Sequence, residues 1–207
     1  VVRRRKAAEH PCFTLVSHSL ISEANLFPGR SDMNSFVIDD TKQSLSPVIN
    51  SQSRVLILGT MPGDESLRQQ RYYANPRNQF WSIISRVYRV AVPDDYDNRI
   101  SLLLELGIAL WDVLRSADRR GSLDSAIKNE AANDFANLFN AFPNVAAAGF
   151  NGRKAYDLYR KHVIGGQRVS KPLVTQILPS TSSTPGRYVL SFDDKVKRWS
   201  EFLLRDR

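Results

Sequence analysis

The chain has 207 residues, of which 42% are hydrophobic, and a formal net charge of +8 with a sequence pI near 9.8. This length and hydrophobic content allow one domain with a substantial core, and the positive charge favours a polyanionic partner without naming it. The single cysteine, Cys12, excludes an internal disulfide and a cysteine-based metal site, and no apolar run is long enough to cross a membrane.

Residues 1–45 show weak periodicity, scattered Ser, Asn and Asp, and turn signals such as Pro28-Gly29. We therefore expect a poorly ordered N-terminal extension, in which the basic run at residues 3–6 is either a solvated tail or a nonspecific phosphate contact. The short apolar segments 36–38 and 47–49 are candidates for docking on the folded part. A single domain is expected to fill residues 46–207.

The first predicted strand and helix enclose a long polar loop between residues 54 and 88. Residues 55–58 (VLIL) are a continuous apolar run that ends at Gly59, which is typical of a strand buried on both faces of a parallel sheet. The loop holds Pro62-Gly63 and the aromatic, amide-rich segment 72–81. A helical face then follows at Phe80, Ile84, Val87 and Tyr88. Such a loop lies at the carboxyl edge of an open sheet, where ligands bind in these folds.

Later segments continue this alternation of strand and helix. A helix is predicted over 94–106 with Gly107 after its end, then a strand over 108–113 and a polar loop over 115–122. Short helices are predicted over 123–128 and 133–142, a buried strand over 145–150, and a helix that opens at Asn151-Gly152. A fourth strand over 173–178, a polar loop over 179–187 and a helix beginning at Ser191 complete the chain. The pattern predicts a three-layer α/β/α sandwich around a central, mostly parallel, four-stranded sheet.

Several common catalytic and cofactor-binding motifs are absent from the sequence. The loop 59–63 lacks the Lys-Ser/Thr pair of a P-loop, no GxGxxG follows a strand, and there is no GxSxG. His10, His18 and His162 stand apart from carboxylate clusters, so a metal site is not expected.

Amides and small hydroxyl side chains recur where three of the predicted strands end. Asn78 lies in the first loop, Asn151 follows the third strand, and residues 180–183 follow the fourth. An asparagine side chain carries a donor and an acceptor in one plane, which suits the edge of a nucleobase. Serine hydroxyls and backbone N–H groups suit phosphate. These residue types therefore favour a nucleic-acid ligand at this edge of the sheet.

Six segments in order resemble the uracil-DNA glycosylase superfamily. They are GTMPG (59–63), YYANPRNQFW (72–81), LWDV (110–113), GSLD (121–124), FNG (150–152) and LPSTS (178–182). Within the superfamily they are most similar to the hypoxanthine-DNA glycosylase branch, a relative of the G:T/U mismatch-specific enzymes. The resemblance runs from about residue 46 to the C-terminus. It implies hydrolysis of the N-glycosidic bond of a damaged base flipped out of DNA, with no metal or cofactor.

The resemblance also implies roles for individual residues. Asn78 would hold the attacking water below the sugar C1′, because Met61 stands where related enzymes carry a polar, water-activating residue. Tyr73 would stack on the extruded base and Asn151 would pair with its edge. The rest of the base pocket would come from the first loop: Gly59, Met61 and Pro62. The residues that would grip the DNA backbone and enter the vacated stack are Gly63, Ser180, Thr181, Ser182 and Ser183.

Three positions depart from the pattern of these relatives. Asn75 stands where they usually have His, which alters any water relay there. The fourth-strand loop continues Ser182-Ser183-Thr184-Pro185 in place of Ser-Pro-Ala-Asn, so the intercalating residue is not fixed. Leu178 replaces the catalytic His of the uracil branch, which argues for a branch that acts without imidazole.

Structural roles compete with these catalytic and binding roles. Asn78 and Asn151 could simply cap helices, Tyr73 could be a packing residue, and turn capping competes with phosphate contact for the hydroxyls after the fourth strand. Asp112 and Asp124 are assigned to loop orientation or capping, not to catalysis. Three large aromatic residues are expected in the core: Phe80, Trp81 and Trp111.

The sequence therefore predicts a monofunctional DNA glycosylase of the hypoxanthine type that acts in base-excision repair. Two alternatives stay open. One is a preference for uracil or G:T/U mismatches, and the other is a nucleic-acid-binding module that has lost its chemistry, which Met61 and Asn75 make conceivable. The expected partner is DNA that carries a damaged base, and the expected protein is a cytoplasmic, nucleoid-associated monomer.

Overall fold

A computed structural model of the protein describes residues 41–169, 171–182 and 190–205. The predicted extension up to residue 40, with its apolar segment 36–38, lies outside the described residues. The helices and strands run in the order β1 (Thr41–Gln43), β2 (Val55–Gly59), α1 (Asp64–Gln69), α2 (Phe80–Tyr88), α3 (Tyr96–Glu105), β3 (Ile108–Asp112), β4 (Leu114–Asp118), a 3₁₀ turn (Asp124–Ala126), β5 (Lys128–Ala132), α4 (Phe135–Ala141), β6 (Ala147–Asn151), α5 (Arg153–Tyr159) with a π-helical turn (Arg160–Ile164), β7 (Val174–Leu178) and α6 (Phe192–Leu203).

The central sheet has four strands in the order β3-β2-β6-β7, and all three pairings are parallel. The apolar runs that predicted these strands have this composition because both faces of the sheet are covered. All five residues of β3 are buried, and Leu56, Ile57 and Leu58 of β2 are fully buried. The predicted four-stranded parallel sheet is therefore confirmed.

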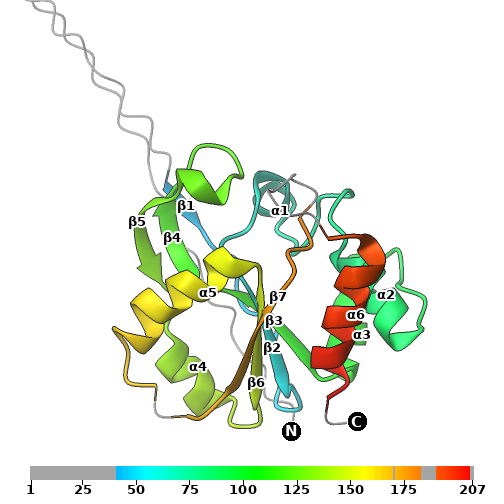
Figure 1. Ribbon diagram of the computed structural model, residues 1–207. Coiled ribbons are helices and arrows are strands. Elements are labelled where there is room, and N and C mark those ends of the chain that lie inside the picture. The colour runs from blue at the N-terminus through cyan, green and yellow to red at the C-terminus, as the bar shows by residue number, and fades with distance from the viewer. Residues whose placement is uncertain (1–40, 170, 183–189, 206–207) are drawn as a thin grey trace, which may run out of the picture. The chain divides into compact units, whose positions relative to one another are not determined.

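Helices cover both faces of this sheet (Figure 1). On one face, Phe135 and Leu138 of α4 and Leu158 of α5 pack with Leu56 and Leu58 of β2 in one hydrophobic cluster. On the other face, the second cluster gathers apolar residues from three helices and the sheet: Phe80, Ile83, Ile84, Leu103, Trp199, Phe202, Leu203 and Ile57. Alternate residues of β2 thus serve opposite cores, and the three-layer α/β/α sandwich is confirmed.

A second, smaller sheet was not predicted. It has the order β1-β4-β5 and both of its pairings are antiparallel. The predicted polar loop over 115–122 and the predicted helix over 123–128 are therefore wrong: β4 occupies Leu114–Asp118, and β5 begins at Lys128 after a single 3₁₀ turn. The sequence of β5, KNEAA, is polar and shows no alternation of apolar and polar residues. Backbone pairing with β4, and not burial of side chains, therefore forms this strand.

The N-terminal part of the described chain lies along both sheets. β1 pairs with β4, Leu45 is buried, and Val48 exchanges two 2.9 Å backbone hydrogen bonds with Leu110 at the edge of the central sheet. The predicted docking of segment 47–49 is thus present, and residues 41–45 also pack against the two sheets.

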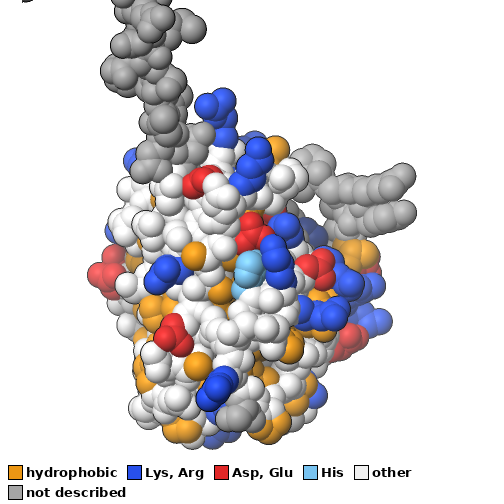
Figure 2. All heavy atoms as spheres, turned by 90° about the vertical axis from the view of Figure 1, so that its left-hand side faces the viewer, with side chains coloured by type: hydrophobic (Ala, Val, Ile, Leu, Met, Phe, Trp, Pro, Cys, Tyr) orange, Lys and Arg blue, Asp and Glu red, His pale blue; other side chains and the backbone are white. Residues whose placement is uncertain are grey.

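The face that carries α4, α5, β4 and β5 has basic and acidic side chains interspersed on it (Figure 2). This mixed surface does not form a continuous basic patch. Among the helices that the structure describes, none has the length and apolar character needed to cross a bilayer.

Candidate active site

A cavity of about 580 Å³ lies at the carboxyl edge of the central sheet, where the ends of β2, β3 and β6 meet the loops that follow β2 and β7. Most of the predicted site residues line it: Gly59, Met61, Pro62, Gly63, Tyr73, Asn78, Asn151, Ser180 and Ser182. Residues far apart in the sequence converge here because parallel strands end at the same edge of a sheet. Thr181 lies beneath the cavity wall, and Ser183 lies outside the described residues.

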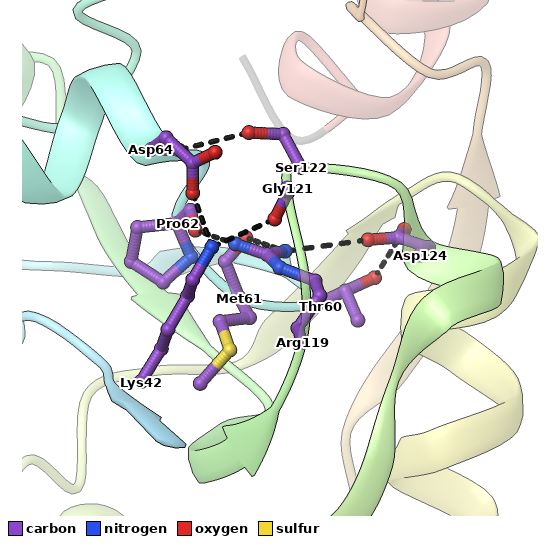
Figure 3. Close-up of polar contacts among 9 residues, drawn as sticks. All are labelled: Lys42, Thr60, Met61, Pro62, Asp64, Arg119, Gly121, Ser122 and Asp124. Carbon is purple, nitrogen blue, oxygen red and sulfur yellow. Dashed lines mark hydrogen bonds and ion pairs between the residues drawn. The ribbon is translucent and has the colours of Figure 1, made fainter. Parts of the chain in front are cut away.

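One wall of the cavity is the loop 60–64, which follows β2. Four residues hold this loop from behind, and we call them the polar clamp: Lys42, Arg119, Ser122 and Asp124 (Figure 3). Arg119 is 1% exposed, and its guanidinium donates hydrogen bonds to the backbone oxygens of Met61 and Pro62. These bonds turn the two carbonyl groups toward Arg119, and the N–H of Gly63, in the same peptide unit as the Pro62 oxygen, points away from it.

The other members of the polar clamp fix the two ends of the loop. Thr60 Oγ1 donates to Asp124 Oδ2 over 2.9 Å, and the N–H of Asp64 donates to Ser122 Oγ over 2.9 Å. Lys42 forms an ion pair with Asp64 and donates to the backbone oxygen of Gly121. The ion pair is the main reason that the pKa of Asp64 lies below its usual value. Asp124 therefore orients a loop, as the sequence indicated.

Asn78 lies just before helix α2, which begins at Phe80 as predicted. Its Oδ1 accepts a 3.0 Å hydrogen bond from the N–H of Phe80, and its own N–H donates to the Asn75 oxygen over 2.9 Å. Asn78 is not the N-cap of α2, which is Gln79, and its bond to Phe80 is an Asx turn; the same side chain lines the cavity. An amide oxygen has two lone pairs, so this one hydrogen bond orients Asn78 without exhausting its acceptor capacity.

The neighbouring residue, Gln79, ties this segment to two distant elements. Its N–H donates to the Thr181 oxygen over 2.9 Å, and its Oε1 accepts from Lys195 Nζ over 2.8 Å. Lys195 lies on α6 and is 7% exposed, and burial lowers the pKa of its ammonium group. Lys195 was not predicted from the sequence, although its spacing from Trp199 places both on one face of the helix.

A second wall is held by neutral side chains, which we call the amide network: Asn151, Thr181 and Tyr73. Asn151 Nδ2 donates to Thr181 Oγ1 over 2.9 Å and to the Tyr73 hydroxyl over 3.2 Å, and its Oδ1 accepts from the Thr181 N–H over 2.9 Å. Asn151 is not a helix cap. Thr181 is fully buried, and its hydroxyl group serves the wall of the cavity.

Tyr73 has φ of +54°, a conformation that is uncommon for a residue with a bulky side chain. Its ring stacks on Phe80, with centroids 3.9 Å apart and planes 13° apart, and burial raises the pKa of its hydroxyl. Tyr72, in contrast, is 5% exposed and donates to the backbone oxygens of Leu45 and Ser46, so it is a packing residue.

Asp112 is the site residue that the sequence reading did not single out for chemistry. It ends β3, lines the cavity and is 4% exposed. No group of three or more His, Cys, Asp or Glu side chains suited to a metal ion occurs within 41–169, 171–182 and 190–205. His162 contacts one carboxylate, because its Nε2 lies 3.4 Å from Glu130 Oε1.

Residues 46–203 match the family model described as the uracil DNA glycosylase superfamily. The chain belongs to this superfamily. It is 35% identical over 148 residues to a protein of Methanosarcina acetivorans named hypoxanthine DNA glycosylase, a match that covers 71% of this chain and 90% of that one. It is 38% identical over 115 residues to a protein of the same name from Methanosarcina barkeri, covering 55% and 73% of the two chains.

A solved structure shares the fold of this superfamily member. The solution NMR structure of a protein from Methanosarcina acetivorans, described as a candidate uracil DNA glycosylase, superposes with a TM-score of 0.66 and 33% identity. The match covers 80% of this chain and 98% of that one.

Proposed function

We propose that this member of the uracil DNA glycosylase superfamily hydrolyses the N-glycosidic bond of hypoxanthine flipped out of DNA, as the first step of base-excision repair. The observation that carries the proposal is the position of Asn78, which lines one cavity together with the loop after β2. Two relatives named hypoxanthine DNA glycosylase, at 35% and 38% identity, support hypoxanthine as the base. The side chains and backbone of this chain catalyse the reaction without a metal or cofactor. The protein acts on chromosomal DNA as a monomer.

Asn78 holds the attacking water. The N–H of Phe80 fixes its Oδ1, and the anchored Gln79 holds the backbone beside it, so the remaining lone pair has a defined direction. An amide cannot take up a full proton, so Asn78 contributes placement of the water below C1′ and not basicity.

The flipped base enters between the loop after β2 and Tyr73. Phe80 covers one face of the Tyr73 ring, and the base stacks on the other face. The N–H of Gly63, which Arg119 turns away from the clamp, serves a base carbonyl. The amide of Asn151 is already hydrogen-bonded to Thr181 and Tyr73, so its role is to shape the pocket more than to bind the base.

The DNA backbone lies against the exposed rim of the cavity. Ser180 and Ser182 line the cavity and are exposed, and Arg77 adds a positive charge at the same rim. Hydroxyl, backbone N–H and guanidinium groups are the usual phosphate contacts of DNA-binding proteins.

A second candidate function is release of uracil. The solved structure that resembles this chain is described as a candidate uracil DNA glycosylase. Hypoxanthine and uracil also share the carbonyl and N–H edge that a pocket of backbone N–H groups and amides contacts.

The test is alkali-revealed cleavage of end-labelled duplexes that carry one deoxyinosine, deoxyuridine, deoxyxanthosine or G:T pair. We expect the wild type to cleave at deoxyinosine, and Asn78→Ala to lose this cleavage. Asn140→Ala, an exposed amide on α4 away from the cavity, is the control and should retain it. Preferred cleavage at deoxyuridine would select the second candidate, and tight binding without cleavage of any duplex would identify a non-catalytic module.

A further inference from the structure

Asp112 lines the cavity, and the water placement and base binding proposed above do not involve it. Its side chain is 4% exposed, and the ion pairs of the described residues do not include it. In this it differs from Asp64 and Asp124 at the same cavity, which pair with Lys42 and Arg119. A buried carboxyl group with no cation in contact is costly to ionise.

Four groups face the carboxyl group of Asp112 from the surrounding segments. Ser44 Oγ donates to its Oδ2 over 3.0 Å, and the Tyr72 hydroxyl is close enough to interact with it. Arg119 and Asp124 act on it with opposite charges. Burial outweighs all of these and raises the pKa of Asp112 to about 7. Below pH 7 most of these side chains therefore hold a proton that they can donate.

The neighbouring strand leaves room for this carboxyl group. Gly59 of β2 lies opposite Asp112 in the parallel register, and a Cβ on Gly59 would come within 2.6 Å of Asp112 Oδ1. Any other residue at position 59 would therefore displace the carboxyl group. Both residues line the cavity, so the carboxyl group lies next to the space that a base would occupy.

We propose that Asp112 is a catalytic acid, whose protonated carboxyl group donates a hydrogen bond and then a proton to N7 of a flipped-out purine. The inference rests on the proposed glycosylase function and names the class of base that the site serves. Asn78 and Asp112 line the same cavity and act on the two sides of the scissile bond: one holds water at the sugar and the other protonates the base.

Protons and electrons balance in this step. The bond between C1′ and N9 breaks, its electron pair stays with the base, and N7 takes the proton of Asp112. The water held by Asn78 gives its oxygen and one hydrogen to C1′. Its other proton returns through solvent to the Asp112 carboxylate. The products are neutral hypoxanthine with its proton on N7 and an abasic sugar, and the acid is regenerated.

The test is the pH profile of single-turnover hypoxanthine release from a deoxyinosine duplex, between pH 5 and pH 9. The wild-type rate should fall about tenfold per pH unit above pH 7, as the acid is lost. Asp112→Asn keeps the shape of the side chain but cannot transfer a proton. Its rate at pH 6 should be about 10²-fold lower, without the decline at high pH.

Two further measurements separate a catalytic acid from a structural residue. Asp112→Asn should bind the deoxyinosine duplex with the wild-type Kd and melt no lower than the wild type. The control Asp118→Asn, on β4 outside the cavity, should keep the wild-type rate and profile. If the wild-type rate is flat across pH 7, or if Asp112→Asn retains the wild-type rate or the decline, the proposal is overturned.

Failure of this inference and failure of the proposed function give different results. A wild type that releases no hypoxanthine at any pH contradicts the proposed function itself. A wild type that releases hypoxanthine with no decline above pH 7 leaves that function standing and removes only the role of Asp112.

Discussion

The two walls of the cavity are held by different chemistry. The polar clamp uses charged groups behind the loop 60–64, and its buried arginine contacts two backbone oxygens and Asp124. The amide network uses neutral donors and acceptors that satisfy one another within the wall. The polar clamp thus uses charge to position a loop, whereas the amide network holds its wall with neutral groups alone.

The largest expected effect concerns Asp112, which belongs to neither wall. Its pKa rises from 3.8 to about 7 on folding, so the folded state binds the proton more tightly than the unfolded chain. The stabilisation is complete below pH 4, declines between pH 4 and pH 7, and is absent above pH 7. Asp112→Asn does not titrate, so at pH 8 it should be more stable than the wild type by at most about 4 kcal/mol.

Urea unfolding of both proteins at pH 5, pH 6.5 and pH 8 measures this effect. The difference in free energy of unfolding should grow with pH across this range. A difference in free energy of unfolding that stays constant with pH would show that the pKa of Asp112 does not change on folding. Asp112 would then not differ in this respect from the ion-paired Asp64 and Asp124.

The next effect tests the polar clamp. Arg119→Met removes the donors to the Met61 and Pro62 oxygens and leaves Asp124 without its cation, so unfolding should become easier by about 3 kcal/mol. Lys42→Met is the matched control, because its partner Asp64 is half-exposed; we expect a loss below about 1 kcal/mol. Equal losses in the free energy of unfolding, measured in urea, would show that the buried contacts of Arg119 stabilise the fold no more than the Lys42–Asp64 ion pair does.

The smallest effect tests the amide network. Thr181→Val keeps the N–H that donates to Asn151 but removes the Oγ1 acceptor, so Asn151 Nδ2 loses one partner. The expected loss in free energy of unfolding is about 1–2 kcal/mol. Thr175→Val, at an exposed position of β7, is the control and should be nearly neutral. A loss as small as that of the control would mean that the network does not hold this wall.

The central sheet and the convergence of the site could be predicted from the sequence for one reason. Strands covered on both faces must be apolar throughout, and parallel strands bring their ends together, so runs such as 55–58 carry both pieces of information. The small sheet could not be predicted in this way. β5 is polar and has exposed residues, and what forms it is pairing with β4, which no local pattern encodes.

The burial of the charged residues of the site could not be predicted from the sequence for a related reason. Arg119 and Asp112 look like ordinary loop or strand-end residues, and their burial comes from segments distant in the chain, such as the loop 60–64 and Ser44. Asn78 and Asn151 were singled out because amides recur where the strands end, and the resemblance assigned their roles, but the partners of Asn151 are visible only in the fold. Lys195 left a weak signal, a lysine on the apolar face of α6.

The most direct test of the account compares Asn78→Ala with the wild type on one labelled deoxyinosine duplex, measuring the single-turnover rate of base release and the Kd in parallel. The account predicts a rate at least about 10²-fold lower, because the water is no longer placed, with a Kd close to the wild-type value. Equal loss of rate and affinity, or an unchanged rate, would contradict the role of Asn78 at the centre of this site.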